Sequence, residues 1–503
     1  MAAGSSRRQG YLGGGGKLFL YPGTAFYHEE LWWHRRGIRT MTPDLLLAFY
    51  GDDFTGSTDV LEALSLGGVR TVLFLESPSS EALERFEDVR AVGIAGTSRG
   101  MSPSEMAETL PAIFETLSAF EAPIIQYKIC STFDSLPTVG SIGQAIDLAQ
   151  DRLNAPFVPV VVAAPELAPR GRYVAFGNLF ATVDDRTYRL DRHPTMAEHP
   201  VTPMTEADLT RHLGDQTDRP IANLELRHVR KGALPLETAL DACLEEAEIV
   251  VFDGITVEDQ AKVGRLIWER ACQSEGLVAA ASSGLDYALV QHWQAQGLIE
   301  KPEHQGPLSA VDQIAVVSGS ASPVTAAQID WALAHGFEGI RLDTVELIDP
   351  EAADSARERA LTTALSALED GSSPLLYSVR GPDDPAVDRT IERGRELGLS
   401  SGAVGRRLAR QQGALLRSLL SRSALTRACV AGGDTSGEVA PALEIFALEY
   451  AASVGPGSPL CRAFAREPAC DGLELALKGG QVESRNGDSD YFGLVRQGGL
   501  APS

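Results

Sequence analysis

The sequence is short of positive charge, of long apolar stretches and of paired cysteines, and each shortage excludes a class of protein. Its 503 residues include 44 Lys and Arg against 68 Asp and Glu, for a formal net charge of -24. Such an acidic chain is a poor match for nucleic acid or an anionic membrane, although it can still build a small basic pocket for phosphates. No apolar stretch is long enough to span a bilayer. We therefore expect a soluble protein of two or three domains, with neither nucleic-acid nor membrane partners.

Cysteines are few and do not form a recognisable framework. No CxxC pair and no zinc-like spacing occur among them, which predicts reduced thiols, no disulfide and no structural zinc. Arg7 and Arg8 are not followed by an apolar segment of signal-peptide length, which argues against export. These observations together predict a cytoplasmic protein. The six cysteines are Cys130, Cys243, Cys272, Cys429, Cys461 and Cys470.

Two common nucleotide-binding motifs are also absent. Neither half of the chain has a GxGxxG run after an early strand with an acidic residue about twenty positions later, so a dinucleotide-dependent oxidoreductase is disfavoured. The pattern GxxxxGK followed by Ser or Thr is missing, so the chain is not a P-loop NTPase by motif. An aldolase or other lyase would need a Schiff-base lysine or a histidine-rich metal site, and neither is evident.

What the sequence does contain is a strand, a tight turn and a helix start around two adjacent carboxylates. The apolar residues 45–49 lead into Asp52 and Asp53, and an amphipathic segment follows. Open α/β sheets bind ligands at the carboxyl ends of their strands. Paired negative charge there is costly unless it holds a metal, accepts a proton or binds hydroxyls, which favours a catalytic role. The alternative is that one aspartate only caps the helix.

Short apolar strands alternate with amphipathic helices from residue 45 to about residue 226. This pattern is typical of βαβ units and predicts an α/β fold with a mostly parallel sheet. After the first strand, the predicted strands are 69–75, 91–96, 123–128 and 158–164. Residues 171–180 are expected to form one arm of a hairpin.

Polar side chains follow several of these predicted strands. Two carboxylates opposite a guanidinium, an ammonium and hydroxyls would suit a small polyhydroxy acid, with Arg or Lys on its carboxylate. The alternatives are that Arg99 forms a surface salt bridge and that Lys128 ends a strand in solvent. The side chains concerned are Asp52, Asp53, Arg99, Lys128, Ser131 and Thr132.

The loop at residues 193–204 contains three prolines and two histidines, which makes it extended and rigid. A metal site at this spacing is weakly indicated, and a structured interdomain or active-site loop is the favoured interpretation. The metal ligands, if any, are unknown from the sequence. A linker near residues 229–236 then precedes a second α/β half, so we expect domains at 41–232 and 233–503.

Three strand ends of the second half are rich in glycine and serine, at residues 318–322, 432–437 and 479–480. A loop of this kind before a helix aims backbone N–H groups at an anion, so three of them predict a nucleotide phosphate site. Each loop alone would be an ordinary turn. Residues 278–284 have a similar strand end and belong to the same predicted half of the chain.

The first forty residues differ from the rest of the chain. They hold four consecutive glycines, and then aromatic and basic residues that include Trp32 and Trp33. We expect residues 1–40 to be a disordered extension or the result of a start codon assigned too early, with the folded protein beginning near Met41. The competing hypothesis is that the two tryptophans dock on the folded body.

Taken together and in order, these motifs resemble the four-carbon acid sugar kinase family over residues 45–492. The resemblance implies an N-terminal sugar-acid domain and a C-terminal ATP domain that face each other across an active-site cleft. The motifs are Gly51-Asp52-Asp53-Phe54-Thr55-Gly56, residues 128–135, His199-Pro200-Val201-Thr202-Pro203-Met204, Val317-Ser318-Gly319-Ser320, Gly432-Gly433-Asp434-Thr435 and Lys478-Gly479-Gly480. The chain departs from the family after Lys478, where the family often has Ser-Gly-Asn-Phe-Gly.

The resemblance also implies the roles of individual residues. Phosphoryl transfer from Mg-ATP would need a base, for which Asp52 and Asp53 are the candidates and Asp434 is the rival. The substrate would be contacted by Arg99, Lys128, Ile129, Cys130, Ser131 and Thr132. The nucleotide would be contacted by Ser318, Gly432, Gly433, Asp434, Thr435 and Gly480. A homodimer is the assembly that we expect.

Cys130 bears on the substrate. Threonate and erythronate kinases tend to carry an aspartate before the Ser-Thr pair, whereas this chain resembles the oxo-acid kinases. Replacing a carboxylate by a thiol removes a hydroxyl acceptor, which suits a ketone-bearing acid. We therefore expect a 3-oxo-tetronate or 3-oxo-isoapionate kinase, with a D-threonate or D-erythronate kinase, or a non-catalytic sugar-acid sensor, as alternatives.

Overall fold

A computed structural model describes residues 45–168, 171–183, 185–199, 201–302, 306–484 and 489–500. The extension expected at residues 1–40 and the predicted start at Met41 lie outside the described residues. Residues 43–503 cluster as one compact unit. Among the described helices, none combines the length and the apolar character that a bilayer crossing requires.

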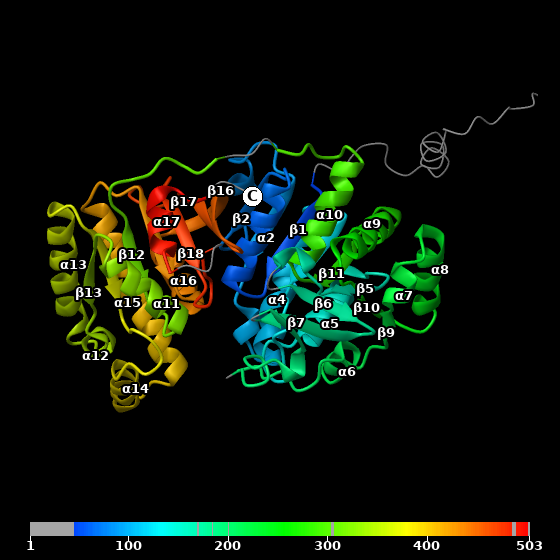
Figure 1. The fold of residues 1–503 in the computed structure, drawn as a ribbon, viewed down its shortest axis with the longest axis horizontal. Helices are drawn as coiled ribbons and strands as arrows, with labels where there is room; N and C mark the ends of the chain where they lie inside the picture. Colours follow the sequence, from blue (N-terminus) through cyan, green and yellow to red (C-terminus); the bar gives the residue numbers. More distant parts are fainter. Residues whose placement is uncertain are drawn as a thin grey trace, which may run out of the picture. The chain divides into compact units, whose positions relative to one another are not determined.

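One fifteen-stranded sheet forms the framework of the fold (Figure 1). Its first eight strands in spatial order are β13 (Phe337–Arg341), β14 (Ser373–Tyr377), β12 (Ala315–Ser318), β15 (Arg427–Ala431), β18 (Glu474–Lys478), β17 (Ser458–Ala465), β16 (Ile445–Gly455) and β2 (Thr71–Phe74). The order continues with β3 (Ala91–Ala95), β1 (Leu47–Gly51), β4 (Ile124–Lys128), β11 (Leu277–Ala281), β5 (Val158–Val161), β10 (Ile249–Phe252) and β9 (Ile221–Leu224). Pairing is parallel except at β2·β16, β16·β17 and β17·β18.

Helices cover both faces of the sheet. Around the strands of the first half they are α2 (Phe54–Leu66), α3 (Ser80–Leu83), α4 (Pro103–Ser118), α5 (Ile142–Leu153), α6 (Leu209–Gly214), α7 (Leu226–Val229), α8 (Ala233–Leu244), α9 (Val257–Gln273) and α10 (Ser283–Ala295). The second half carries α11 (Pro323–Leu333), α12 (Thr344–Ile348), α13 (Ala353–Glu369), α14 (Ala386–Glu396), α15 (Ser401–Ser421), α16 (Gly433–Ala442) and α17 (Tyr491–Gln497). The 3-10 helices are η1 (Ser98–Gly100), η2 (Pro165–Leu167) and η3 (Leu190–Arg192).

The predicted α/β fold with a mostly parallel sheet is confirmed, and the predicted early strands correspond to β1 to β5. The hairpin expected near residue 171 is present as β6 (Arg172–Ala175) and β7 (Asn178–Val183), which form a small antiparallel sheet with β8 (Arg186–Arg189). Its register places Tyr173 opposite Phe180.

Strands β10 and β11 follow the predicted linker in sequence but pair with strands that precede it. Strands β10 and β11 follow residue 233, yet β10 pairs with β5, and β11 lies between β4 and β5. This pairing differs from the expected division into 41–232 and 233–503, because a parallel crossover can insert a late strand between two early ones. We propose that the first domain extends through α10 and that the second begins near β12.

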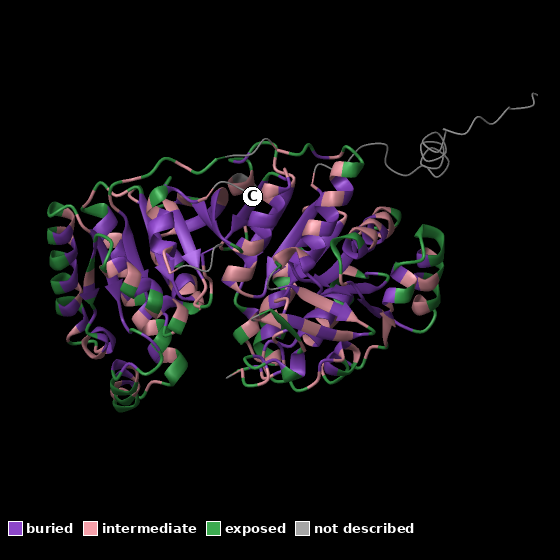
Figure 2. Cartoon of the chain, in the orientation of Figure 1, coloured by how far each residue is buried: buried purple, intermediate pink, exposed green. Residues whose placement is uncertain are grey.

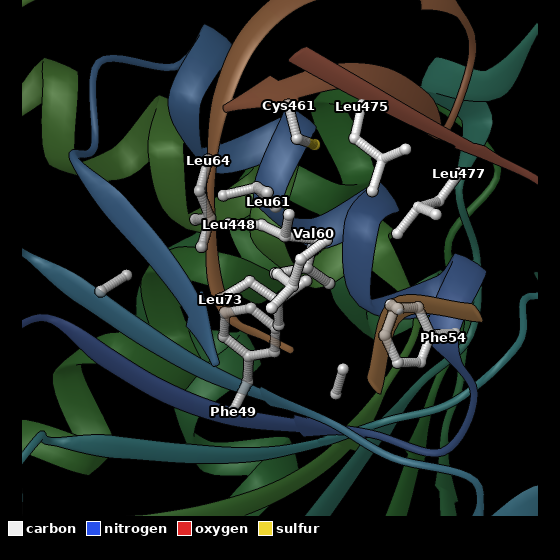
Figure 3. Packing of buried hydrophobic residues seen from close by; sticks show 14 of the residues in the cluster. Phe49, Phe54, Val60, Leu61, Leu64, Leu73, Leu448, Cys461, Leu475 and Leu477 are labelled. Carbon is white, nitrogen blue, oxygen red and sulfur yellow. The ribbon is translucent and has the colours of Figure 1, made fainter. Parts of the chain in front are cut away.

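The strands supply the core, and helix α2 links its two sides. Burial is continuous along the central strands, whereas exposed residues lie on the outer faces of helices such as α13 and α14 (Figure 2). Val60, Leu61 and Leu64 of α2 belong to the same hydrophobic cluster as Phe49 of β1 and Leu448 of β16 (Figure 3). Both halves of the sheet therefore share one hydrophobic cluster.

Candidate active site

The first candidate residues lie at the turn between β1 and α2. Gly51 ends the strand, and Asp53 is extended (φ -141°) at the N-cap of the helix. Its Oδ1 accepts a hydrogen bond from the backbone N–H of Gly56 (2.8 Å), and its Oδ2 accepts one from the Thr55 hydroxyl (2.8 Å). The capping role considered for one of the aspartates therefore belongs to Asp53.

Arg99 binds both carboxylates at once. Its Nε and Nη2 donate to the two oxygens of Asp52 at 3.2 and 2.7 Å. Its Nη1 and Nη2 donate to the two oxygens of Asp53, both at 2.9 Å. The contact is partly buried, because the Asp52 side chain is only 3% exposed and that of Arg99 is 24% exposed. Arg99 therefore is not in a surface salt bridge, and its guanidinium orients the two aspartates.

Adjacent aspartates have opposite pKa shifts. Burial raises the pKa of Asp52 to about 6, although the positive charge of Arg99 opposes the shift. Burial also acts to raise the pKa of Asp53, but Arg99, Lys128 and the hydrogen bonds to its oxygens outweigh it and hold that pKa below its ordinary value. One carboxyl group can thus exchange a proton near neutral pH, while its neighbour stays charged.

Lys128 ends β4 inside the protein and not in solvent. Its side chain is 2% exposed, and its Nζ lies 3.4 Å from Oδ2 of Asp59. A Cβ added at Gly56 would lie 3.2 Å from Lys128 Nζ and 2.4 Å from Oδ1 of Asp53, so the ammonium and that carboxylate share one small space. Burial acts to lower the pKa of Lys128, but the three surrounding aspartates outweigh it and raise that pKa.

The turn after β4 contributes smaller polar groups. The Cys130 Sγ and the Thr132 hydroxyl are 2.8 Å apart, and Ser131 lies half-buried between them in sequence. Burial raises the pKa of the Cys130 thiol to about 11, so it is neutral. The side chain of Ile129 is fully buried in the core, and its backbone N–H donates to the carbonyl of Ala281. The predicted substrate contact of Ile129 therefore remains a prediction, and the structure shows its side chain packed in the core.

A second group of candidate residues gathers where β12, β15 and β18 end. β15 lies between the other two strands, so their glycine- and serine-rich ends are neighbours. The residues brought together are Ser318, Gly432, Gly433, Asp434, Thr435 and Gly480.

Close backbone approach explains the glycines in this group. Gly432 has φ +123°, a conformation that side chains rarely allow. A Cβ added at Gly319 or Gly432 would lie 2.2 or 2.8 Å from the Thr435 hydroxyl oxygen. One added at Gly480 would lie 2.9 Å from Oγ of Ser320. These turns therefore form a cradle in which glycine backbones lie against neighbouring hydroxyl groups, with little room for larger side chains.

Within the cradle some positions remain accessible to a ligand. A Cβ at Gly433, the first residue of α16, would meet nothing within 4 Å, and Asp434 is exposed. The hydroxyl of Ser318 is buried and has no hydrogen-bond partner. An unpaired buried hydroxyl at a strand end next to the strand that precedes α16 fits a phosphate-bearing ligand.

Lys478 was predicted only as part of a sequence motif. In the structure it fixes the loop at residues 479–480, the third loop of the cradle. Its Nζ donates to the hydroxyl of Thr325 (3.1 Å) and to the carbonyl of Gly479 (2.9 Å). The side chain is fully buried, and burial lowers its pKa to about 8. Lys478 therefore holds the loop in place.

Helix α2 brings the two groups of candidate residues together. A Cβ at Gly479 would lie 3.5 Å from Cγ2 of Thr55, whose hydroxyl binds Asp53. One turn later, the Thr58 hydroxyl donates to the carbonyl of Gly457 (3.3 Å). The aspartates and the glycine cradle are therefore neighbours.

Both histidines of the loop at residues 193–204 accept hydrogen bonds from the backbone of that loop. Nδ1 of His193 accepts from the backbone N–H of Thr195 (3.2 Å), and Nδ1 of His199 accepts from that of Thr202 (3.0 Å). Within the described ranges, no group of three or more His, Cys, Asp or Glu residues could hold a metal ion. Pro200 of this loop lies outside the described residues.

Sequence reasoning missed the polar residues that follow β5 and β11, namely Glu166, Ser283 and Asp286. The Ser-Ser-Gly end of β11 was noticed but was counted with the nucleotide loops. Only the pairing of β11 with β4 and β5 assigns it to the aspartate side.

Two domain families match this arrangement. A sugar-binding N-terminal domain matches residues 47–289, and a nucleotide-binding C-terminal domain matches residues 315–492. The fold and the two residue groups thus define a protein with a sugar-binding half and a nucleotide-binding half.

Relatives along most of the chain specify the family. A 3-oxo-isoapionate kinase from Paraburkholderia graminis is 49% identical over 457 residues, which are 91% of this chain and 95% of the relative. A 3-oxo-tetronate kinase from Pseudomonas fluorescens is 32% identical over 459 residues, 91% of this chain and 98% of the relative. A crystal structure from Salmonella typhimurium LT2 shares the fold with a TM-score of 0.70, 24% identity, and coverage of 89% of this chain and 97% of that one. The chain belongs to the four-carbon acid sugar kinase family.

Proposed function

We propose that this chain transfers the γ-phosphoryl group of ATP to the terminal primary hydroxyl of a small 3-oxo acid sugar. The observation that carries the proposal is the contact region at the start of α2, where Thr55 binds Asp53 and lies beside Gly479. A hydroxyl held by the aspartates would lie next to a phosphate held by the glycine cradle. The interdomain cleft expected from the family remains a prediction.

The choice of a 3-oxo acid rests on the neutral thiol and on the relatives. Cys130 cannot accept a hydroxyl proton as a carboxylate would, which favours a ketone at that part of the substrate. Among the relatives, the one that is 49% identical is named a 3-oxo-isoapionate kinase, and those near 30% identity are named 3-oxo-tetronate kinases. We favour the branched acid, 3-oxo-isoapionate, over the linear one.

Asp52 is the base that we favour, with Asp53 as the orienting group. A general base works best when its pKa lies near the operating pH, and that of Asp52 is about 6. Asp53 stays charged and fixes Arg99, Thr55 and the turn. Phosphoryl transfer needs mainly alignment and charge stabilisation, with the proton accepted late. Asp434, the rival base, is exposed on the nucleotide side.

The nucleotide would be held by Ser318, Gly432, Gly433, Thr435 and Gly480, whose geometry leaves room for phosphates. Mg²⁺ would accompany ATP, neutralising charge on the β- and γ-phosphates, because this ion usually keeps several waters and few protein ligands. Lys128 and Arg99 lie on the acid-sugar side, where they offset the negative charge of the substrate and of the aspartates. Free thiols at all six cysteines agree with a reducing cytoplasmic setting, which we propose as its location.

The test is a substrate panel with the purified protein, Mg²⁺ and ATP. The panel contains 3-oxo-isoapionate, 3-oxo-tetronate, D-threonate and D-erythronate, and phosphorus NMR identifies the phosphorylated hydroxyl. We expect the highest kcat/KM with a 3-oxo acid and one phosphoester formed per ADP. Faster turnover of D-threonate would instead support the hydroxy-acid alternative, and acid binding without any ATP turnover would support the sensor.

A further inference from the structure

A second set of polar side chains lies at the same sheet edge as the aspartates. The spatial order β1, β4, β11, β5 is fully parallel, so the carboxyl ends of these four strands lie side by side (Figure 1). The first two strands lead to Asp52 and Lys128. β11 leads to Ser283 at the start of α10, and β5 leads to Glu166 in η2.

Several atoms of this second set are buried without a partner. Ser283 and Asp286 are 1% and 0% exposed, and Oγ of Ser283 and Oδ1 of Asp286 lack any hydrogen bond from another residue. The same holds for both carboxyl oxygens of Glu166. An unsatisfied buried polar atom costs about 1–3 kcal/mol, and native proteins usually satisfy such atoms with protein, water or ligand. Their concentration at one edge therefore indicates a ligand.

The elements that carry the three residues pack against one another. Oδ2 of Asp286 accepts from Nε2 of Gln126 (3.1 Å), and Gln126 lies two positions before Lys128 on β4. A Cβ at Gly284 would lie 1.9 Å from the carbonyl oxygen of Ala163, so the start of α10 packs on the segment that leads to η2.

Their electrostatic surroundings connect this set to the first one. The carboxylates of Asp59, Glu166 and Asp286 all act to raise the pKa of Tyr287, and the charge of Lys128 acts on Asp286. Asp59 is the residue that contacts the Lys128 ammonium. The second set is therefore linked to Lys128 through β4, which carries both Lys128 and Gln126, the hydrogen-bond partner of Asp286.

The chemistry of the set matches alcohols. Burial raises the pKa of Asp286 to about 8 and that of Glu166 to about 7. A neutral carboxyl group and a serine hydroxyl can each donate and accept a hydrogen bond, as the hydroxyl groups of a sugar do. An anionic group would instead lie against two carboxyl groups here, so the set suits uncharged hydroxyl groups better than an anion.

We propose that Glu166, Ser283 and Asp286 form a subsite that binds hydroxyl groups of the acid sugar beside Lys128. The inference rests on the proposed function for its substrate class. The branched acid presents one more hydroxyl group than the linear acid, so the subsite matters most for the branched substrate.

The test uses the full-length protein with Ser283→Ala, Glu166→Gln and Asp286→Asn, made separately. Steady-state kinetics are measured with both 3-oxo acids and with ATP varied in turn. Each variant should raise the KM for the branched acid by about 3- to 10-fold, the equivalent of one lost hydrogen bond, and should raise it less for the linear acid. The KM for ATP should stay within about twofold. Such a split separates loss of acid binding from general damage.

Ser373→Ala is the matched control, because it removes an equally buried hydroxyl from β14 in the other half. It should leave the KM for both acids unchanged. Folded variants of all three subsite residues with the wild-type KM for the acid would overturn the subsite while leaving the kinase proposal intact. A wild-type protein that phosphorylates no acid would overturn the kinase proposal, and the subsite with it.

Discussion

Asp52 and Asp53 are neighbours in the chain, bind the same guanidinium and still have opposite pKa shifts. The difference comes from the number of donors that stabilise each charge. Asp53 accepts from Gly56 and Thr55 in addition to Arg99, whereas the oxygens of Asp52 are bound by Arg99 within a more buried setting. A base and a fixed anion can therefore be adjacent residues.

Removing either charge should abolish most of the activity. We expect Asp52→Asn and Asp53→Asn each to lower kcat by about two to four orders of magnitude, the range for loss of general-base catalysis and of its alignment. Folding should survive, which circular dichroism checks. If both variants turned over at near wild-type rates while Asp434→Asn was inactive, the base would lie in the nucleotide half.

The pH profile should report the ionisation of Asp52. A base must be deprotonated to act, so kcat/KM should reach its plateau well above pH 6, be half-maximal near pH 6 and fall further as the pH decreases. The negative charge of Asp53 is one cause that raises the pKa of Asp52. In the residual activity of Asp53→Asn, the acid limb should therefore shift to lower pH. A limb that keeps its wild-type position would show that another group is the base.

At the scale of elements, the N-terminal turn of α16 is where the nucleotide proposal can be tested sterically. Gly433→Val would fill space that the ATP phosphates need, whereas φ at this position does not demand glycine. ATP affinity measured by calorimetry should fall at least about tenfold, since the side chain would displace phosphate contacts. Gly437→Val is the control, because it also meets open space one turn later. Equal ATP affinity in both folded variants would contradict the proposed cradle.

Helix α2 is anchored to the second half through Glu62. Its carboxylate accepts from the Ser453 hydroxyl (2.7 Å) and from the backbone N–H of Gly457 (2.8 Å). Glu62→Gln would place an amide donor against one of these donors. We expect a loss of about 1–3 kcal/mol in the free energy of unfolding, measured by urea denaturation.

Glu449→Gln provides the comparison for Glu62→Gln. Glu449 lies on β16, the strand that carries Ser453, and contacts Arg70 of the first half, but this 3.5 Å ion pair is exposed. Exposed pairs contribute between about 0 and 1 kcal/mol, so this variant should change stability little. If Glu449→Gln lowered the free energy of unfolding as much as Glu62→Gln does, burial of the contact would not explain its contribution to stability.

Strand β11 illustrates what local sequence could and could not predict. Its residues 277–281 were expected to form a buried strand, and its polar end was recognised. Which strands it pairs with depends on contacts about 120–150 residues away in sequence, and periodicity carries no such information. The residues after β11 were consequently assigned to the second half of the chain, whereas β11 pairs with strands of the first half.

At the scale of the whole molecule, the short motifs predicted which strand ends carry polar residues, whereas the spacing did not predict the pairing of β10 and β11. Strand-end residues such as Asp52 and Lys128 meet because parallel strands share one edge, a rule that the sequence could apply. The bridging of two aspartates by Arg99 could not be predicted, because it depends on distances of about 3 Å that side-chain packing sets. The roles of the site residues stay predictions until the variants are measured.

Residues 1–40 lie outside the described part of the chain, and the compact unit that contains both candidate sites begins at Pro43. Deleting residues 1–40 should therefore leave kcat/KM unchanged and shift the melting temperature by less than about 2 °C. Differential scanning calorimetry measures the shift. If Trp32 and Trp33 dock on the body, each would contribute up to about 3–5 kcal/mol, and the truncated protein would melt clearly lower.

The antiparallel pairing of β2 with β16 also has a consequence for synthesis on the ribosome. β2 is translated early, but the strand that covers its open side comes more than 370 residues later. An unpaired strand edge invites pairing with other chains. The nascent first half therefore carries an exposed edge until nearly all of the second half has emerged. A chain interrupted before residue 445 would keep that edge permanently, so incomplete translation products of this protein should be prone to aggregate.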